Sequence, residues 1–122
     1  MLYAVLIYDD EEAIAALPKA AFDRLIANHE GVQEKLAAEG RLGPVARLMP
    51  TTAATTLRQG GETVLLDGPF AETKEQLLGF YIVDCASLDE ASAAAGEIGK
   101  ACNARALEIR PVHLFFPGIG LT

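Results

Sequence analysis

Residues 67–81 read DGPFAETKEQLLGFY, and this stretch is the most distinctive part of the chain. The residue before a proline avoids the α region and glycine allows tight turns, so Asp67-Gly68-Pro69 predicts a turn at the end of a strand. Thr73 and Gln76 have the spacing of a capping box, which predicts one helical turn there. The run GFYIVDC at 79–85 is typical of a strand, because it is rich in aromatic and β-branched residues.

The residues that precede this stretch predict a strand, a helix and a hairpin. Residues 2–8, LYAVLIY, form the continuous apolar run of a buried strand. From Pro18 onward, apolar residues recur every three or four positions, which predicts an amphipathic helix that stops near Gly40. Residues 41–52 contain two prolines and allow only a short or edge strand. Residues 54–67 predict a hairpin, since two glycines separate its apolar halves.

The residues that follow predict a second helix and a last strand. Ser87 and Glu90 have the spacing of a capping box before an alanine-rich helix. Residues 106–112 alternate between apolar and charged side chains, as a half-exposed strand does. The order β-α-β-(hairpin)-β-α-β predicts one α+β domain, residues 1–122, with a ferredoxin-like sheet and helices on one face. The opposite face needs a cover, so we expect a homodimer.

Composition excludes several classes of function. The net charge is −7, which argues against a nucleic-acid partner because such proteins present a basic face. The N-terminus lacks a basic segment and turns acidic after eight residues, so we expect no signal peptide, no membrane span and a cytoplasmic location. The two cysteines, Cys85 and Cys102, lack the spacing of a metal or redox motif and are expected to be free thiols.

The stretch DGPFAETKEQL followed by GFY resembles the signature of the DGPF family, which belongs to the wider group of YCII-related proteins. The opening LYAVLIYDDEEA, the segment PTTAATTLRQGGETVLL and the closing SLDEAS and EIRPV extend the resemblance over most of the chain. Position 78 is leucine, where the family more often has a second glycine. The resemblance implies a dimeric α+β barrel built from ferredoxin-like protomers.

The resemblance also implies two kinds of function. Some YCII-related proteins are enzymes that act on small, often aromatic, molecules with a histidine–aspartate pair, and a dehydrochlorinase is among them. Other DGPF-type proteins are associated with alternative sigma factors, which implies a regulatory role. For this chain, one hypothesis is therefore a lyase or isomerase without a cofactor, and the alternative is a ligand-binding or regulatory module. A purely structural dimer is a third.

His29 and Asp67 are the candidate catalytic residues. His29 lies on the apolar stripe of the first helix, and Asp67 lies at a strand end beside the proposed pocket. If the two met, the carboxylate would orient the imidazole, which would act as a general base near neutral pH. The alternative interpretations are a packed core histidine and an aspartate that only accepts hydrogen bonds within its turn.

Candidate ligand-binding residues surround the same stretch. Lys74 is a candidate anchor for an anionic ligand, although a solvent-exposed turn with local ion pairs would also explain it. Aromatic side chains are candidates for a pocket wall, although strand aromatics are core residues by default. They are Phe70, Phe80, Tyr81 and Tyr3. The remaining histidine, His113, precedes an apolar tail and is expected to be structural.

No metal or cofactor is expected. The two histidines are distant in sequence and have no metal-ligand spacing. Dinucleotide-binding, phosphate-binding and nucleophilic-serine motifs are missing from the sequence.

Overall fold

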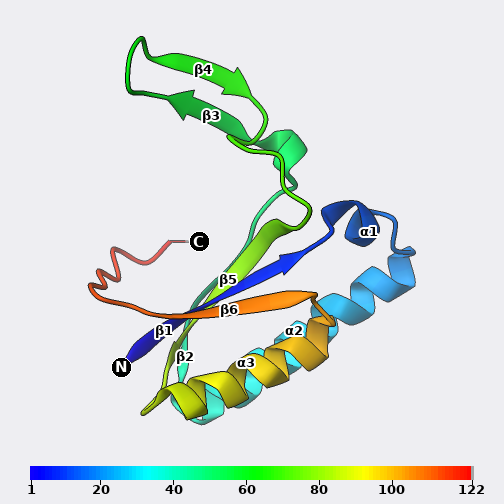
Figure 1. The fold of residues 1–122 in the computed structure, drawn as a ribbon. Helices are drawn as coiled ribbons and strands as arrows, with labels where there is room; N and C mark the ends of the chain where they lie inside the picture. Colours follow the sequence, from blue (N-terminus) through cyan, green and yellow to red (C-terminus); the bar gives the residue numbers. More distant parts are fainter. Residues whose placement is uncertain (122) are drawn as a thin grey trace.

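A four-stranded antiparallel sheet with the strand order β2-β5-β1-β6 forms the centre of the molecule (Figure 1). The structure is a computed structural model, and it describes residues 1–121. The strands of the central sheet are β1 (Leu2–Asp9), β2 (Leu42–Arg47), β5 (Gln76–Asp84) and β6 (Ala106–Pro111). This is the strand order of a ferredoxin-like fold, so the α+β prediction is confirmed.

Two long helices, α2 (Lys19–Ala38) and α3 (Leu88–Cys102), cover one face of this sheet (Figure 1). Alternate residues of β1, from Tyr3 to Asp9, are buried toward the helices because successive side chains of a strand point to opposite faces. Tyr81 and Val83 of β5 face the same way. The core therefore lies between the sheet and the two helices, and its buried members also include Leu36, Ala91, Ala94, Ala95 and Ile98.

The helix termini follow the sequence signals. Pro18 is the N-cap residue of α2, and beyond the C-terminus of α2 Gly40 adopts a φ of 72°, a left-handed conformation that glycine tolerates. The side chain of Ser87 accepts a hydrogen bond from the Glu90 N–H at 3.2 Å and caps α3. The two long helices that the sequence predicts are confirmed.

The predicted hairpin is present, and it stands apart from the central sheet (Figure 1). It consists of β3 (Thr55–Arg58) and β4 (Val64–Asp67), and every residue of β4 is exposed to solvent. A short 3₁₀ helix, Thr51–Ala53, leads into it from β2.

The structure differs from the sequence-based expectation at two places. The predicted helical turn at residues 73–76 is wrong. The Thr73 hydroxyl and the Gln76 amide donate to nearby carbonyls at 2.6 and 2.7 Å, and the Gln76 side-chain oxygen accepts from the Glu11 N–H at the start of α1 at 3.0 Å instead of from Thr73. A short helix that the sequence did not suggest, α1 (Glu11–Ala15), follows β1 and is capped by Asp10.

Candidate functional site

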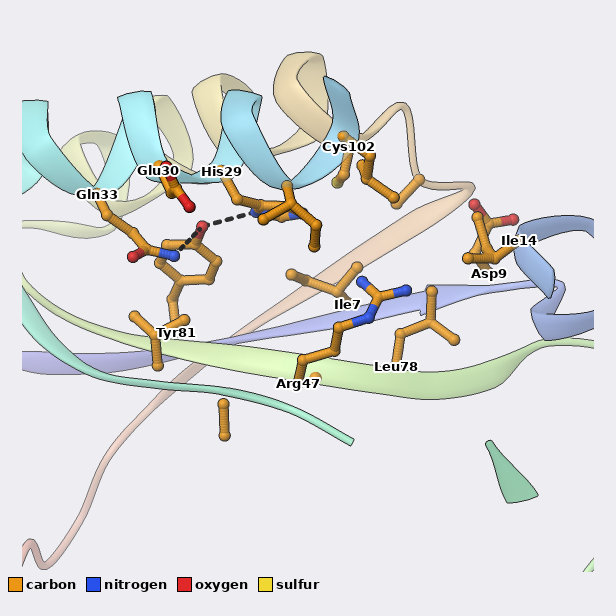
Figure 2. A pocket seen from close by; sticks show the side chains of 16 residues that line it. Ile7, Asp9, Ile14, His29, Glu30, Gln33, Arg47, Leu78, Tyr81 and Cys102 are labelled. Atoms are coloured by element: carbon orange, nitrogen blue, oxygen red, sulfur yellow. Dashed lines mark hydrogen bonds between the residues drawn. The ribbon is translucent and has the colours of Figure 1, made fainter. Parts of the chain in front are cut away.

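A cavity of about 230 Å³ lies between the helix-covered face of the sheet and helix α2 (Figure 2). Its walls come from β1, α1, α2, β2, β5, the C-terminal end of α3 and the segment that follows it. Most of the wall is apolar and includes Ile7, Ile14, Leu25, Ile26 and Leu78. Polar groups occupy a few positions in it: Asp9, His29, Glu30, Gln33, Arg47, Tyr81 and Cys102. An apolar cavity with a few polar groups is the usual form of a small-molecule site.

His29 is held in the wall of this cavity by Tyr81. Leu25, His29 and Gln33 follow one another at intervals of four on α2, so they share the face that covers the sheet. The Nδ1 atom of His29 lies 2.7 Å from the Tyr81 hydroxyl oxygen, and the two rings stack with centroids 5.8 Å apart. The Gln33 amide donates to the same hydroxyl oxygen at 3.4 Å (Figure 2).

The direction of these hydrogen bonds defines which histidine nitrogen serves the cavity. Because the Tyr81 oxygen accepts from Gln33, its own hydrogen is free to be donated to Nδ1 of His29. When Tyr81 donates, the hydrogen of the neutral ring is on Nε2, and when Tyr81 accepts, it is on Nδ1; in both cases Nε2 is the nitrogen that Tyr81 leaves available to a ligand.

Burial and charge both favour the neutral form of His29. Desolvation lowers the pKa of His29 below 6.5, and the positive charge of Arg47 lowers it further. Burial raises the pKa of Tyr81, so its hydroxyl stays protonated at neutral pH. Burial also raises the pKa of Cys102, whose thiol donates to the Ile98 carbonyl at 3.1 Å. The cavity thus holds a neutral imidazole and a protonated thiol, which is a poor nucleophile.

Two charged residues at strand ends, Asp9 of β1 and Arg47 of β2, border the cavity on the side of the sheet. Asp9 is only 8% exposed, accepts a hydrogen bond from the Asp10 N–H at 2.8 Å and lies 3.5 Å from Nε of Arg105. The guanidinium of Arg47 lies over the ring of Phe22, 5.3 Å from its centroid.

Sequence reasoning missed both residues, although Asp9 continues the buried alternation of β1. Arg47 gave no signal, because it ends a strand that two prolines obscured.

The predicted His29–Asp67 pair is not formed within the chain. Asp67 ends β4 in the separate hairpin and is not among the residues that line the His29 cavity. The hydrogen-bond partner of His29 is Tyr81. The buried carboxylate in the wall of the cavity belongs to Asp9. The hairpin, whose strand β4 ends at Asp67, stands apart from helix α2, which carries His29 (Figure 1).

Of the predicted ligand-binding residues, only Tyr81 borders the His29 cavity. Tyr3 is buried in the core, and Phe70 is 74% exposed on the loop after the hairpin. Phe80 precedes Tyr81 on β5, so its side chain points to the opposite face of the sheet. Lys74 borders a different, polar hollow beside the DGPF turn.

That second hollow joins the DGPF turn to the start of α1. It is an open space of about 550 Å³, and its wall includes Gly68, Pro69 and Lys74 together with Glu11. The Glu11 carboxylate accepts a hydrogen bond from the Thr51 N–H at 2.9 Å, which ties α1 to the segment that leads into the hairpin. The distinctive sequence stretch therefore forms a turn that docks near α1.

No metal site and no membrane span are found among the described residues. Within residues 1–121, no three His, Cys, Asp or Glu side chains gather in an arrangement that could hold a metal ion. None of the helices in this range is both long and apolar enough to span a bilayer.

The fold and the cavity define a small α+β protein with a single histidine between its helices and its sheet. The profile of the YCII-related domain matches residues 1–115, and the chain belongs to the YCII-related family. This confirms the resemblance found in the sequence.

Two proteins are similar to this chain. A protein of Rhizobium meliloti (strain 1021), described as uncharacterized, is 54% identical over 120 residues, which are 97% of this chain and 97% of that protein. A solved structure is that of the 5-chloro-2-hydroxyhydroquinone dehydrochlorinase of Burkholderia phenoliruptrix AC1100 in complex with 2,5-dihydroxybenzoquinone. It is 19% identical, with a TM-score of 0.49, and the match covers 92% of this chain and 93% of the other.

Proposed function

We propose that this protein binds a small, single-ring molecule in the His29 cavity and moves a proton on it, as an isomerase or lyase that needs no cofactor. The observation that supports this most directly is the hydrogen-bonded series Gln33–Tyr81–His29, which leaves Nε2 of the imidazole available inside an apolar cavity. An engineered apolar cavity of about 150 Å³ binds benzene, so about 230 Å³ admits one substituted ring.

In this proposal His29 transfers the proton and Asp9 binds the ligand. Tyr81 can donate to Nδ1 or accept from it, so the imidazole can present Nε2 either as a hydrogen-bond donor or as a base. As a base, Nε2 takes a proton from a ligand carbon while Nδ1–H donates to the Tyr81 oxygen. The C–H electron pair becomes a new double bond. In a lyase this displaces a leaving group that departs with its bonding electrons, and in an isomerase it shifts an existing double bond, whose far atom takes the proton back from Nε2–H. Asp9 accepts a hydrogen bond from a ligand hydroxyl group.

The test measures proton transfer directly. Cyclohexanone is a single-ring probe, and its α-hydrogens exchange slowly in D₂O at neutral pD, so NMR can follow a catalysed exchange. We expect the native protein to exceed His29→Gln by about 10² or more, the usual contribution of a positioned acid or base. The matched control is His113→Gln, which changes the exposed second histidine and should leave the rate unchanged. Equal rates in the native protein and His29→Gln would refute the enzyme proposal.

A second candidate function, ligand binding without turnover, has support from the surroundings of His29. Its ring has no carboxylate partner among residues 1–121, and its lowered pKa makes it a weak base. Saturable shifts of the His29 resonance by cyclohexanone, with no exchange above background, would favour this regulatory or binding role.

The proposal includes a homodimer. No helix covers the second face of the central sheet (Figure 1). The hairpin and the C-terminal segment expose large apolar side chains, of which Leu65 is 68% and Phe116 81% exposed. A second copy of the chain is the cover that we propose for these surfaces, because most soluble oligomers are symmetric homo-oligomers. Light scattering should give twice the 12.9 kDa chain mass.

Leu65→Asp tests the role of the hairpin in this dimer. The substitution should shift the protein toward monomer, whereas Leu88→Asp, at an exposed leucine on α3, should not. A monomeric native protein at micromolar concentration would contradict the dimer without bearing on the cavity.

A further inference from the structure

We propose that Arg47 selects an anionic ligand for the His29 cavity, and that this ligand is a ring compound with a carboxylate or an ionised hydroxyl group. The inference rests on the proposed function, because it assumes that the cavity binds a ring. It adds the charge of the ligand and the residue that recognises it.

Arg47 lies at the junction of two cavities. It borders the His29 cavity and also a larger apolar groove of about 630 Å³, whose wall includes Phe22, Leu48 and Met49. Figure 2 shows the guanidinium of Arg47 pointing into the space below the helices, on the side where His29 lies. A ligand in the His29 cavity therefore meets this positive charge at the edge of its ring.

The positive charge of Arg47 is not neutralised within the chain. Arg41, Arg105 and Arg110 each form an ion pair with a carboxylate, but Arg47 forms none within residues 1–121. The guanidinium of Arg47 lies over the face of the Phe22 ring. This cation–π interaction leaves its N–H donors available. A planar guanidinium with free donors is suited to bidentate binding of a carboxylate.

The neighbouring acids are engaged elsewhere. The Asp9 carboxylate lies beside Arg105, and the Glu11 carboxylate accepts hydrogen bonds from the backbone and the hydroxyl of Thr51. Glu30, on the outer wall of the cavity, is exposed to solvent. No carboxylate of the cavity wall therefore occupies the donors of Arg47.

His29 contributes a second donor to the same ligand. With Tyr81 donating to Nδ1, the neutral imidazole presents Nε2–H to the cavity. The Arg47 cation, which lies at the solvent-exposed edge of the cavity, and the N–H donor of His29 are together complementary to an oxygen anion. The protein as a whole carries a net charge of −7 and repels anions, so an anionic ligand requires a local cation of this kind.

The test compares two probes of the same shape and different charge. Benzoate and benzamide are titrated into the full-length protein at pH 7.5 and low salt, with calorimetry and the His29 resonance as readouts. We expect the native protein to bind benzoate about tenfold more tightly, the lower end of what a charge-assisted hydrogen bond gives. Arg47→Gln should reduce this preference to about one, with benzamide affinity unchanged within about threefold.

Three further variants make the result specific. Arg58→Gln removes the same charge from the hairpin and should keep the preference for benzoate. Arg47→Lys keeps the charge and should retain part of the preference. Arg47→Met keeps an apolar side chain against Phe22 and serves if Arg47→Gln does not fold.

The outcomes separate this inference from the function on which it rests. An unchanged benzoate preference in Arg47→Gln overturns the role of Arg47. Equal binding of both probes by the native protein overturns the anionic ligand but leaves ring binding intact. Binding of neither probe overturns both.

Discussion

Tyr81→Phe is the most direct test of the arrangement that holds His29. Phenylalanine keeps the buried ring and its stacking on His29, so the substitution removes only the hydroxyl group. That hydroxyl has two partners, His29 and Gln33. A hydrogen bond contributes about 0.5–1.5 kcal/mol net, and water from the cavity can satisfy part of what is lost. We therefore expect Tyr81→Phe to lower the free energy of unfolding by about 1–2 kcal/mol.

A double-mutant cycle isolates the contact with His29. His29→Phe removes the ring nitrogen, and Tyr81→Phe in that background should cost about 1 kcal/mol less than in the native protein. Urea unfolding followed by circular dichroism at pH 7.5 measures all four proteins, at one protein concentration because a dimer makes stability concentration-dependent. Tyr3→Phe, in the core and outside the cavity, is the control and should show no coupling. A coupling energy below about 0.3 kcal/mol would refute the hydrogen bond.

Three further predictions concern pH and packing. NMR should show that His29 titrates below 6.5 in the folded protein. As the pH falls below 6.5, the unfolded chain takes up a proton at His29 before the folded protein does, so the contribution of neutral His29 to the free energy of unfolding is intact above 6.5 and is lost as the pH falls through the folded-state pKa. His29→Gln should remove this part of the pH dependence of stability. Ser87→Ala should cost about 1 kcal/mol in urea unfolding through loss of the cap on α3, while Ser92→Ala on the exposed face of the same helix should not destabilise. Gly79→Ala should lower the free energy of unfolding by about 2–4 kcal/mol, because the added Cβ would lie 2.3 Å from a carbonyl oxygen of β2. Gly96→Ala in α3 is the contrast: its Cβ meets nothing within 4 Å, so the substitution should raise the free energy of unfolding by up to about 1 kcal/mol.

Each of these three has a contrary outcome. A His29 resonance that titrates above 6.5 would show that a charge partner outweighs burial. A Ser87 variant as stable as its Ser92 counterpart would mean that the α3 cap contributes nothing. A well-tolerated alanine at position 79 would mean that β2 and β5 are farther apart than the structure has them.

The elements of this fold could be predicted because each has a local signal. The alternation of β1, the stripe of α2 and the cap at Ser87 depend on residues within a few positions of one another. The wrong prediction of a turn at 73–76 shows the limit of such signals. Thr73 bonds a local carbonyl, and the Gln76 side-chain oxygen accepts from the distant helix α1 instead of forming a local capping box.

The partner of His29 could not be predicted because it depends on strand order and register. Tyr81 lies under α2 because β5 pairs with β1 so that Tyr81 is opposite Val5, on the face that the helices cover. Asp67 has the chemistry of a partner for histidine, but it is carried away by a hairpin that pairs only with itself. The residue type and its place on the helix stripe identified His29 in the sequence, but its hydrogen-bond partner, Tyr81, could be identified only from the strand topology.

His29 and Arg47, which the sequence did not place together, are electrostatically unfavourable neighbours in the wall of the cavity. Arg47 lowers the pKa of His29, which means that protonating His29 and keeping Arg47 charged oppose each other. An anion bound between them would favour both positive charges. Benzoate should therefore raise the pKa of His29 in the native protein, and by linkage it should bind more tightly as pH falls through that pKa. A titration of His29 with and without saturating benzoate measures this, and an unchanged or lowered pKa would mean that the anion binds away from His29.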